Sequence, residues 1–161
     1  MRAEARRLAA AVRIFRLILS LRALALALVF VAILGGSAAA EPTCTISATD
    51  SNDVIVGTPG PDVICGLGGN DLISGLAGAD TLLGGDGKDI LDGGPGRDTL
   101  DGGAGPDTME GGPGTDLFLA GPGNDVMRAW DGRRDVVNGG PGRDRAWLDR
   151  GLDRAISVEL R

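Results

Sequence analysis

A nine-residue repeat runs through most of this sequence and constrains its fold more than any other feature. Aspartate recurs at every ninth position, glycine stands two residues before most of these aspartates, and an apolar residue stands two residues after them. The aspartates in register are Asp53, Asp62, Asp71, Asp80, Asp89, Asp98, Asp107, Asp116 and Asp125. After a slip of one residue at Asp135, the spacing resumes at Asp144. Such a period predicts a solenoid, in which each repeat is one structural unit that contacts only its neighbours.

Each repeat divides into a six-residue turn and a strand of three residues. Glycine permits positive φ and close backbone approach, so the glycine-rich part forms a tight turn. In the strand the middle side chain points to the opposite face from its two neighbours and is expected to face inward. These middle residues are Ile55, Ile64, Ile73, Leu82, Leu91, Leu100, Met109, Phe118 and Met127. Most prolines fall inside the predicted turns, where they cost no sheet hydrogen bond.

The predicted fold is all-β, a parallel β-roll (β-helix solenoid) over residues 53–128. Two repeats form one coil because successive strands alternate between two sheets, so turns 18 residues apart stack at about 4.8 Å. We expect an N-terminal cap segment at 41–52, and degenerate repeats with a C-terminal cap at 129–161. In that last part, the alternation of Ile156, Val158 and Leu160 indicates a closing strand, with Trp130 and Trp147 as candidate cap residues. The alternative for this arginine-rich end is a docking surface for a partner or an acidic polymer.

Stacking brings the carboxylates of the repeats into columns, for example Asp71 beside Asp89. Without cations such a column repels itself, and one apolar residue in nine buries little surface to offset chain entropy. Carboxylates and backbone carbonyls together form an all-oxygen cage, which suits Ca²⁺ better than Mg²⁺ or zinc. The alternative is that these aspartates only stabilise turns. The candidate metal ligands are Asp53, Asp62, Asp71, Asp80, Asp89, Asp98, Asp107, Asp116, Asp125 and Asp144.

The repeat resembles the RTX (repeat-in-toxin, haemolysin-type) nonapeptide G-G-x-G-x-D-x-U-x, in which U is a large apolar residue. The resemblance is clearest in the two copies that span residues 84–101, covers 50–127 well and extends loosely to 135–147. It implies a β-roll that binds several Ca²⁺ ions through the aspartate of each repeat and folds as it binds them. The long apolar region of the toxins is missing, so toxin activity is not expected.

Residues 1–40 differ from the repeats, and we interpret them as a helical secretory signal peptide that is cleaved after Ala40. Six arginines precede an apolar run from Ala23 to Leu34, and small residues ending in three alanines follow. An uncleaved membrane anchor is the alternative. We therefore expect a secreted, extracellular protein that has no membrane contact after cleavage. Its remaining 10 basic and 21 acidic residues give a net charge of −11, which disfavours nucleic acid and favours cations.

Two cysteines, Cys44 and Cys65, remain after this cleavage. In an exported chain an even pair is expected to form a disulfide, which would pin segment 41–52 to the first repeat. Two free thiols are the alternative.

The sequence contains no recognisable catalytic motif. It has no histidine, no G-x-S-x-G and no H-E-x-x-H, and about ten residues separate Ala40 from the first repeat. We therefore expect a calcium-ion-binding protein and not an enzyme. The alternative function is an extracellular adhesion or matrix scaffold, or a partner-binding module, that uses the calcium-stiffened roll. The sequence leaves its protein or polysaccharide partner unidentified.

Overall fold

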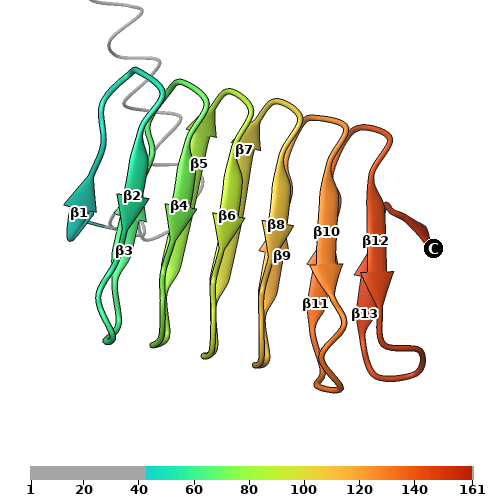
Figure 1. The fold of residues 1–161 in the computed structure, drawn as a ribbon. Helices are drawn as coiled ribbons and strands as arrows, with labels where there is room; N and C mark the ends of the chain where they lie inside the picture. Colours follow the sequence, from blue (N-terminus) through green and yellow to red (C-terminus); the bar gives the residue numbers. More distant parts are fainter. Residues whose placement is uncertain (1–42, 161) are drawn as a thin grey trace, which may run out of the picture. The chain divides into compact units, whose positions relative to one another are not determined.

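The chain forms a parallel β-roll, as the repeat predicts (Figure 1). The computed structural model describes residues 43–160, and the predicted signal peptide lies outside these residues. Within 43–160 the chain forms strands and turns and no helix. Accordingly, this part contains no helix that is long and apolar enough to cross a membrane.

Two seven-stranded parallel sheets make up the roll, and successive strands alternate between them. The first sheet contains β1 (Ile46–Ser47), β3 (Val63–Cys65), β5 (Thr81–Asp86), β7 (Thr99–Ala104), β9 (Leu117–Leu119), β11 (Val136–Asn138) and β13 (Arg154–Ile156). The second contains β2 (Val54–Val56), β4 (Leu72–Ser74), β6 (Ile90–Asp92), β8 (Thr108–Glu110), β10 (Val126–Ala129), β12 (Arg145–Leu148) and β14 (Glu159–Leu160).

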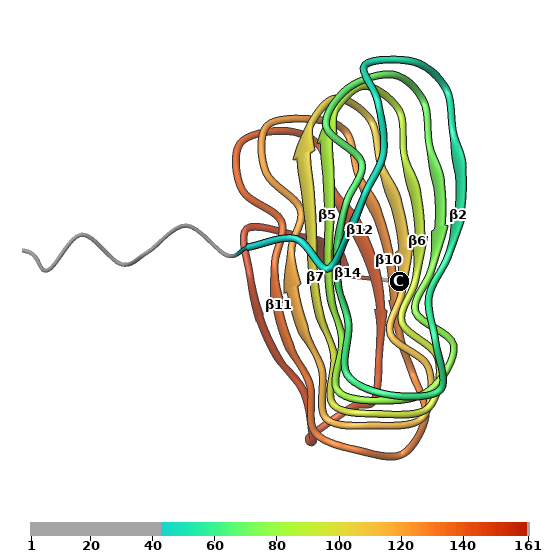
Figure 2. The same ribbon diagram turned by 90° about the vertical axis from the view of Figure 1, so that its left-hand side faces the viewer.

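The strand register confirms that two repeats form one coil. In the first sheet Leu82 pairs with Ile64 on one side and with Leu100 on the other, an offset of 18 residues each time. At the later slip the offset grows by one, because Phe118 pairs with Val137 and Met127 pairs with Ala146. The extra residue is therefore absorbed in a turn, and the inward-facing positions stay aligned. Seen along the roll, successive coils lie over one another as flattened loops (Figure 2).

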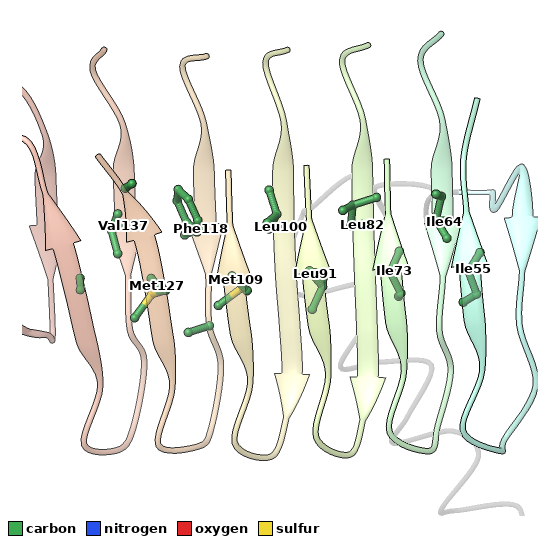
Figure 3. Packing of buried hydrophobic residues seen from close by; sticks show 13 residues of the cluster. Ile55, Ile64, Ile73, Leu82, Leu91, Leu100, Met109, Phe118, Met127 and Val137 are labelled. Atoms are coloured by element: carbon green, nitrogen blue, oxygen red, sulfur yellow. The ribbon is translucent and has the colours of Figure 1, made fainter. Parts of the chain in front are cut away.

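The inward-facing residues of the two sheets alternate along the roll and together form one layer of side chains between the sheets (Figure 3). All nine predicted core residues, from Ile55 to Met127, are buried. Val137 and Ala146 continue the layer beyond the slip and are completely buried. The core is one side chain thick, so each side chain contacts residues of its own coil and of the two coils beside it.

Both ends of the roll extend the sheets beyond residues 53–128. At the N-terminal end β1 pairs with β3, and Cys44 forms a disulfide with Cys65, with the two Cα atoms 5.9 Å apart. At the C-terminal end β13 joins the first sheet and β14 joins the second.

The C-terminal end differs from the expectation in two respects. Trp130 is 70% exposed and Trp147 lies on the outer face of β12, so neither tryptophan covers the core. Trp147 follows the inward-facing Ala146 and must therefore point outward, where the guanidinium of Arg128 lies 6.0 Å from its ring. The expected single closing strand is also wrong. The chain bends at Ser157, which has a φ of 56°, and Ala155 and Val158 pack against the core from the two sides of that bend.

Candidate metal centre

The aspartates of the repeats lie in two rows, one along each edge of the roll. Edge one is formed by the turns that lead from the second sheet to the first, and edge two by the turns that lead back. Edge one carries Asp62, Asp80, Asp98, Asp116, Asp135 and Asp153. Edge two carries Asp53, Asp71, Asp89, Asp107, Asp125 and Asp144. All ten candidate ligands therefore lie in these rows, and Asp135 and Asp153 extend the row on edge one.

One carboxylate oxygen of each aspartate after the first in its row links neighbouring coils. Oδ1 of Asp80 accepts a hydrogen bond from the backbone N–H of Asp62 at 2.8 Å, and Oδ1 of Asp98 accepts one from Asp80 at the same distance. The contact repeats along both edges and continues across the slip, where Asp135 accepts from Asp116 at 2.8 Å. These hydrogen bonds hold each carboxylate in a fixed orientation inside the turn.

The second carboxylate oxygen, Oδ2, has no hydrogen-bond partner in nine of these aspartates. A buried carboxylate oxygen without a donor is costly, because it has lost its hydration and gained nothing in return. A cation at that place would remove the cost. The nine residues are Asp71, Asp80, Asp89, Asp98, Asp107, Asp116, Asp125, Asp135 and Asp144.

In six of these turns, the unpaired oxygen and a backbone carbonyl of the next coil face the same small space beside the first residue of the turn, which is glycine. The turns of Asp125 and Asp135 begin with Ala120 and Ala129 instead. A methyl group added to Gly75 would lie 2.5 Å from Oδ2 of Asp80 and 2.9 Å from the carbonyl oxygen of Gly93. On edge two, a methyl group added to Gly102 would lie 2.7 Å from Oδ2 of Asp107 and 2.7 Å from the carbonyl oxygen of Ala120. Two electron-rich oxygens from successive coils thus point at the same place, as in a cation site.

The chemistry of this arrangement fits a hard cation of calcium size. Neighbouring strands are about 4.8 Å apart, so an ion midway between two coils lies about 2.4 Å from oxygens on each. That distance is within the range of about 2.3–2.6 Å for Ca²⁺ and exceeds the 2.0–2.1 Å of Mg²⁺. Among residues 43–160 no three acidic or cysteine side chains converge on one point. Backbone carbonyls would therefore supply most of the ligands, with the aspartate as the charged one.

Burial raises the pKa of the carboxyl groups in the middle of both rows, among them Asp80, Asp89 and Asp98. It raises the pKa of Asp107 and of Asp116 to about 7, and that of Asp125 and of Asp135 to about 6. Loss of hydration is the largest cause; the N–H bond from the preceding coil opposes it, and neighbouring carboxylates add to it. The ionised form of the metal-free row is therefore unfavourable.

The raised pKa values predict that the metal-free roll loses stability as pH rises. Between about pH 4 and pH 7 the folded state holds protons that the unfolded state has released, so the free energy of unfolding falls across this interval. We expect far-ultraviolet circular dichroism in the presence of a chelator to show less β-structure at pH 7.5 than at pH 5. In the same interval, ions that bind the ionised carboxylates are expected to bind more tightly as pH rises. A metal-free β-structure signal that increases with pH would contradict this prediction.

Asp135 is, with Asp153, one of the two row residues that the candidate ligands from the sequence did not include. Its turn holds an extra residue, and Trp130 and Arg133 stand where other turns have glycine. In the structure it is nevertheless 1% exposed, with its Oδ2 unpaired like the others. The signals in the sequence that Asp135 belongs to the row are the resumption of the spacing at Asp144 and the apolar Val137 two residues after Asp135.

Three aspartates at the ends of the rows differ, because their Oδ2 atoms are hydrogen-bonded. Asp53 accepts from the backbone N–H and the hydroxyl of Thr49, at 2.9 and 2.7 Å. Asp62 accepts in the same way from Thr58, at 2.6 and 2.9 Å. At the other end of edge one, Asp153 accepts from the backbone N–H of Asp149 at 2.6 Å.

Comparison with known proteins gives one family. A model of the RTX calcium-binding nonapeptide repeat matches the chain in four copies, over residues 47–82, 66–100, 92–127 and 131–155. These copies cover more than half of the chain and include the turn that contains Asp135. No curated protein matches the chain.

Proposed function

The chain belongs to the RTX calcium-binding nonapeptide-repeat family, and from that premise we propose that it is an exported, non-enzymatic protein that binds several Ca²⁺ ions. The ions lie between successive turns on both edges, and their binding drives the folding of the roll. The observation that carries this proposal is the series of nine buried, unpaired Oδ2 atoms, six of which face a carbonyl oxygen of the next coil.

Coupling between ion binding and folding follows from the composition of the roll. The core contains one apolar side chain per repeat, which contributes about 1.5–3 kcal/mol when it is buried. Ordering nine residues costs more than that in conformational entropy alone. Uncompensated carboxylates in the same rows oppose folding further. Ions that bind only to the stacked turns would add their binding free energy to the folded state and make folding depend on calcium.

Export would determine where the chain meets calcium and folds. The signal-like segment at 1–40, the cysteine pair and the acidic repeats all suit a protein that works outside the cell. Extracellular calcium sites typically bind with dissociation constants of about 10⁻⁴ to 10⁻³ M. In this proposal the chain stays unfolded at the low calcium concentration of the cytoplasm and folds after export.

A second candidate function is an adhesion or matrix scaffold that holds a partner on the ion-stiffened roll. The outer face of the second sheet supports it, because exposed apolar residues occupy adjacent strands there. Val54 of β2 pairs with Leu72 of β4, which pairs with Ile90 of β6, and all three are at least 45% exposed. A pull-down from the cell surface with and without Ca²⁺, using a Leu72→Ser variant as the control, would test this function.

Titration of the metal-free protein with calcium and with magnesium tests the proposed function. We expect far-ultraviolet circular dichroism to show a cooperative gain of β-structure with Ca²⁺, because the spacing between coils matches its bond length. Mg²⁺ at the same concentration is expected to produce less than about a tenth of the change. A chain that is fully folded without ions would show that the aspartates serve only the turns. A chain that stays unfolded at millimolar Ca²⁺ would contradict the proposal altogether.

A further inference from the structure

We propose that Thr49 and Thr58 close the first turn of each edge to calcium, so that the rows of ions begin at Asp71 and Asp80. This inference rests on the proposed function and deepens it, since it states which aspartates of the repeat do not hold an ion. The repeat pattern alone treats Asp53 and Asp62 as equivalent to the aspartates that follow them.

The contacts of Asp62 differ from those of Asp80, the next aspartate on the same edge. A methyl group added to Gly57 would lie 2.9 Å from Oδ2 of Asp62 and 2.8 Å from the carbonyl oxygen of Gly75, so the two oxygens face each other as in later coils. However, Oδ2 of Asp62 already accepts two hydrogen bonds from Thr58, whereas Oδ2 of Asp80 has no partner. The positive end of the Thr58 N–H dipole is directed at this oxygen and disfavours a cation beside it.

The backbone conformation of the second residue of the turn separates the two kinds of turn. In the turns with an unpaired Oδ2 and the regular length, this residue has a positive φ and donates nothing to the aspartate. The second residue is leucine in two of these turns, Leu67 and Leu76, both with φ of 74°. In the other six turns of regular length it is glycine. Thr49 and Thr58 are not among the residues with positive φ. Their N–H groups instead point at the carboxylate four residues later.

The sequence explains why threonine keeps this conformation. Positive φ is strongly unfavourable for a β-branched side chain, and a following proline further restricts the residue to extended conformations. Thr58 carries both restrictions because Pro59 follows it. Other turns have proline at the third place and an aspartate with an unpaired Oδ2, and these all have glycine at the second place. Examples are Gly94 and Gly112, with φ of 85° and 83°. Thr58 therefore acts as a positioning residue that holds the turn in its closed form.

Closure of the first coil agrees with how that end of the roll is otherwise held. Cys44 lies just before the first turn on edge two, and Cys65 lies in β3, which follows the first turn on edge one. The disulfide between them therefore links these two parts of the chain covalently. The hydroxyl of Thr45 also donates to the carbonyl of Val63 at 3.0 Å. A covalent bond and side-chain hydrogen bonds thus replace ions at the N-terminal end.

Native mass spectrometry of the calcium-saturated protein, which counts bound ions per chain, tests the inference. Thr58→Gly gives residues 57–62 the sequence G-G-P-G-P-D, which matches the open turns at every defined position. We expect this variant to bind one more Ca²⁺ than the wild-type protein. Thr58→Val is the matched control, because it loses the hydroxyl but keeps the restrictions that hold the N–H in place; we expect the wild-type count.

A second pair of variants keeps the test independent of changes in the backbone. Asp62→Asn is expected to leave the number of bound ions unchanged, whereas Asp80→Asn is expected to lose at least one. An unchanged count in Thr58→Gly, or the loss of an ion in Asp62→Asn, would overturn the inference while leaving calcium binding itself intact. A wild-type protein that binds no Ca²⁺ would instead overturn the proposed function.

Discussion

Replacing Phe118 by alanine is expected to destabilise the calcium-loaded roll by about 3–5 kcal/mol. Phe118 is completely buried, and it is the only aromatic residue among the buried core residues of 43–160. Its Cζ atom lies 2.8 Å from the place where a methyl group at Gly111 would be, so the ring fills the space above that glycine. Since the core is one side chain thick, no second layer can collapse into the cavity. Small domains are stable by about 5–15 kcal/mol in total, so the loss is a large part of the stability.

Leu117→Ala provides the control for this prediction. Leu117 is the preceding residue of the same strand and points to the outer face, so its truncation is expected to cost less than about 1 kcal/mol. Both free energies would be measured by denaturant unfolding at saturating Ca²⁺, where ion binding is equal for the two proteins. Similar losses in the two variants would mean that the layer of inward-facing residues is not the core that holds the sheets together.

The arrangement of strands was predictable from the sequence because a single constraint sets it. A coil of two nine-residue units places identical repeat positions over one another, so the residue that faces inward in one repeat faces inward in all. The burial of Ile64, Leu82 and Leu100 on successive strands of the first sheet confirms this reasoning. The alignment of carboxylates on each edge follows from the same repetition, since Asp80 and Asp98 occupy the same place in successive coils.

What the sequence could not reveal is how individual turns depart from the average repeat. Whether Oδ2 of an aspartate is hydrogen-bonded depends on the φ of the residue four positions earlier. The nine-residue repeat pattern does not show that Thr58 donates a hydrogen bond to Oδ2 of Asp62. The position of Asp135 depends on how an extra residue is accommodated in three dimensions. Trp130 and Trp147 were expected to cover the core because they lie where the repeat pattern fails, but their places in the repeat direct them outward. These features are set by stacking between coils, which a linear pattern does not contain.

Substitution of a turn glycine provides the sharpest test of that stacking, and Gly112→Ala is expected to destabilise the roll by about 2–4 kcal/mol. Gly112 has a φ of 83°, a conformation that costs alanine about 1 kcal/mol. A methyl group there would also lie 2.5 Å from the carbonyl oxygen of Gly94 and 2.9 Å from its carbonyl carbon, so the two coils must move apart. Overpacking of this kind adds about 1–3 kcal/mol.

Gly132→Ala separates the two causes, because Gly132 has nearly the same φ, 84°, but nothing within 4 Å of an added methyl group. We expect it to cost only the conformational part, about 1 kcal/mol. The two variants should differ in calcium binding as well. Moving apart the turns that hold Asp98 and Asp116 lengthens the ion–oxygen distances on edge one, so Gly112→Ala should need more Ca²⁺ to fold than Gly132→Ala. Equal calcium midpoints and equal unfolding free energies in the two variants would contradict this prediction. Contact between stacked turns would then limit neither folding nor ion binding.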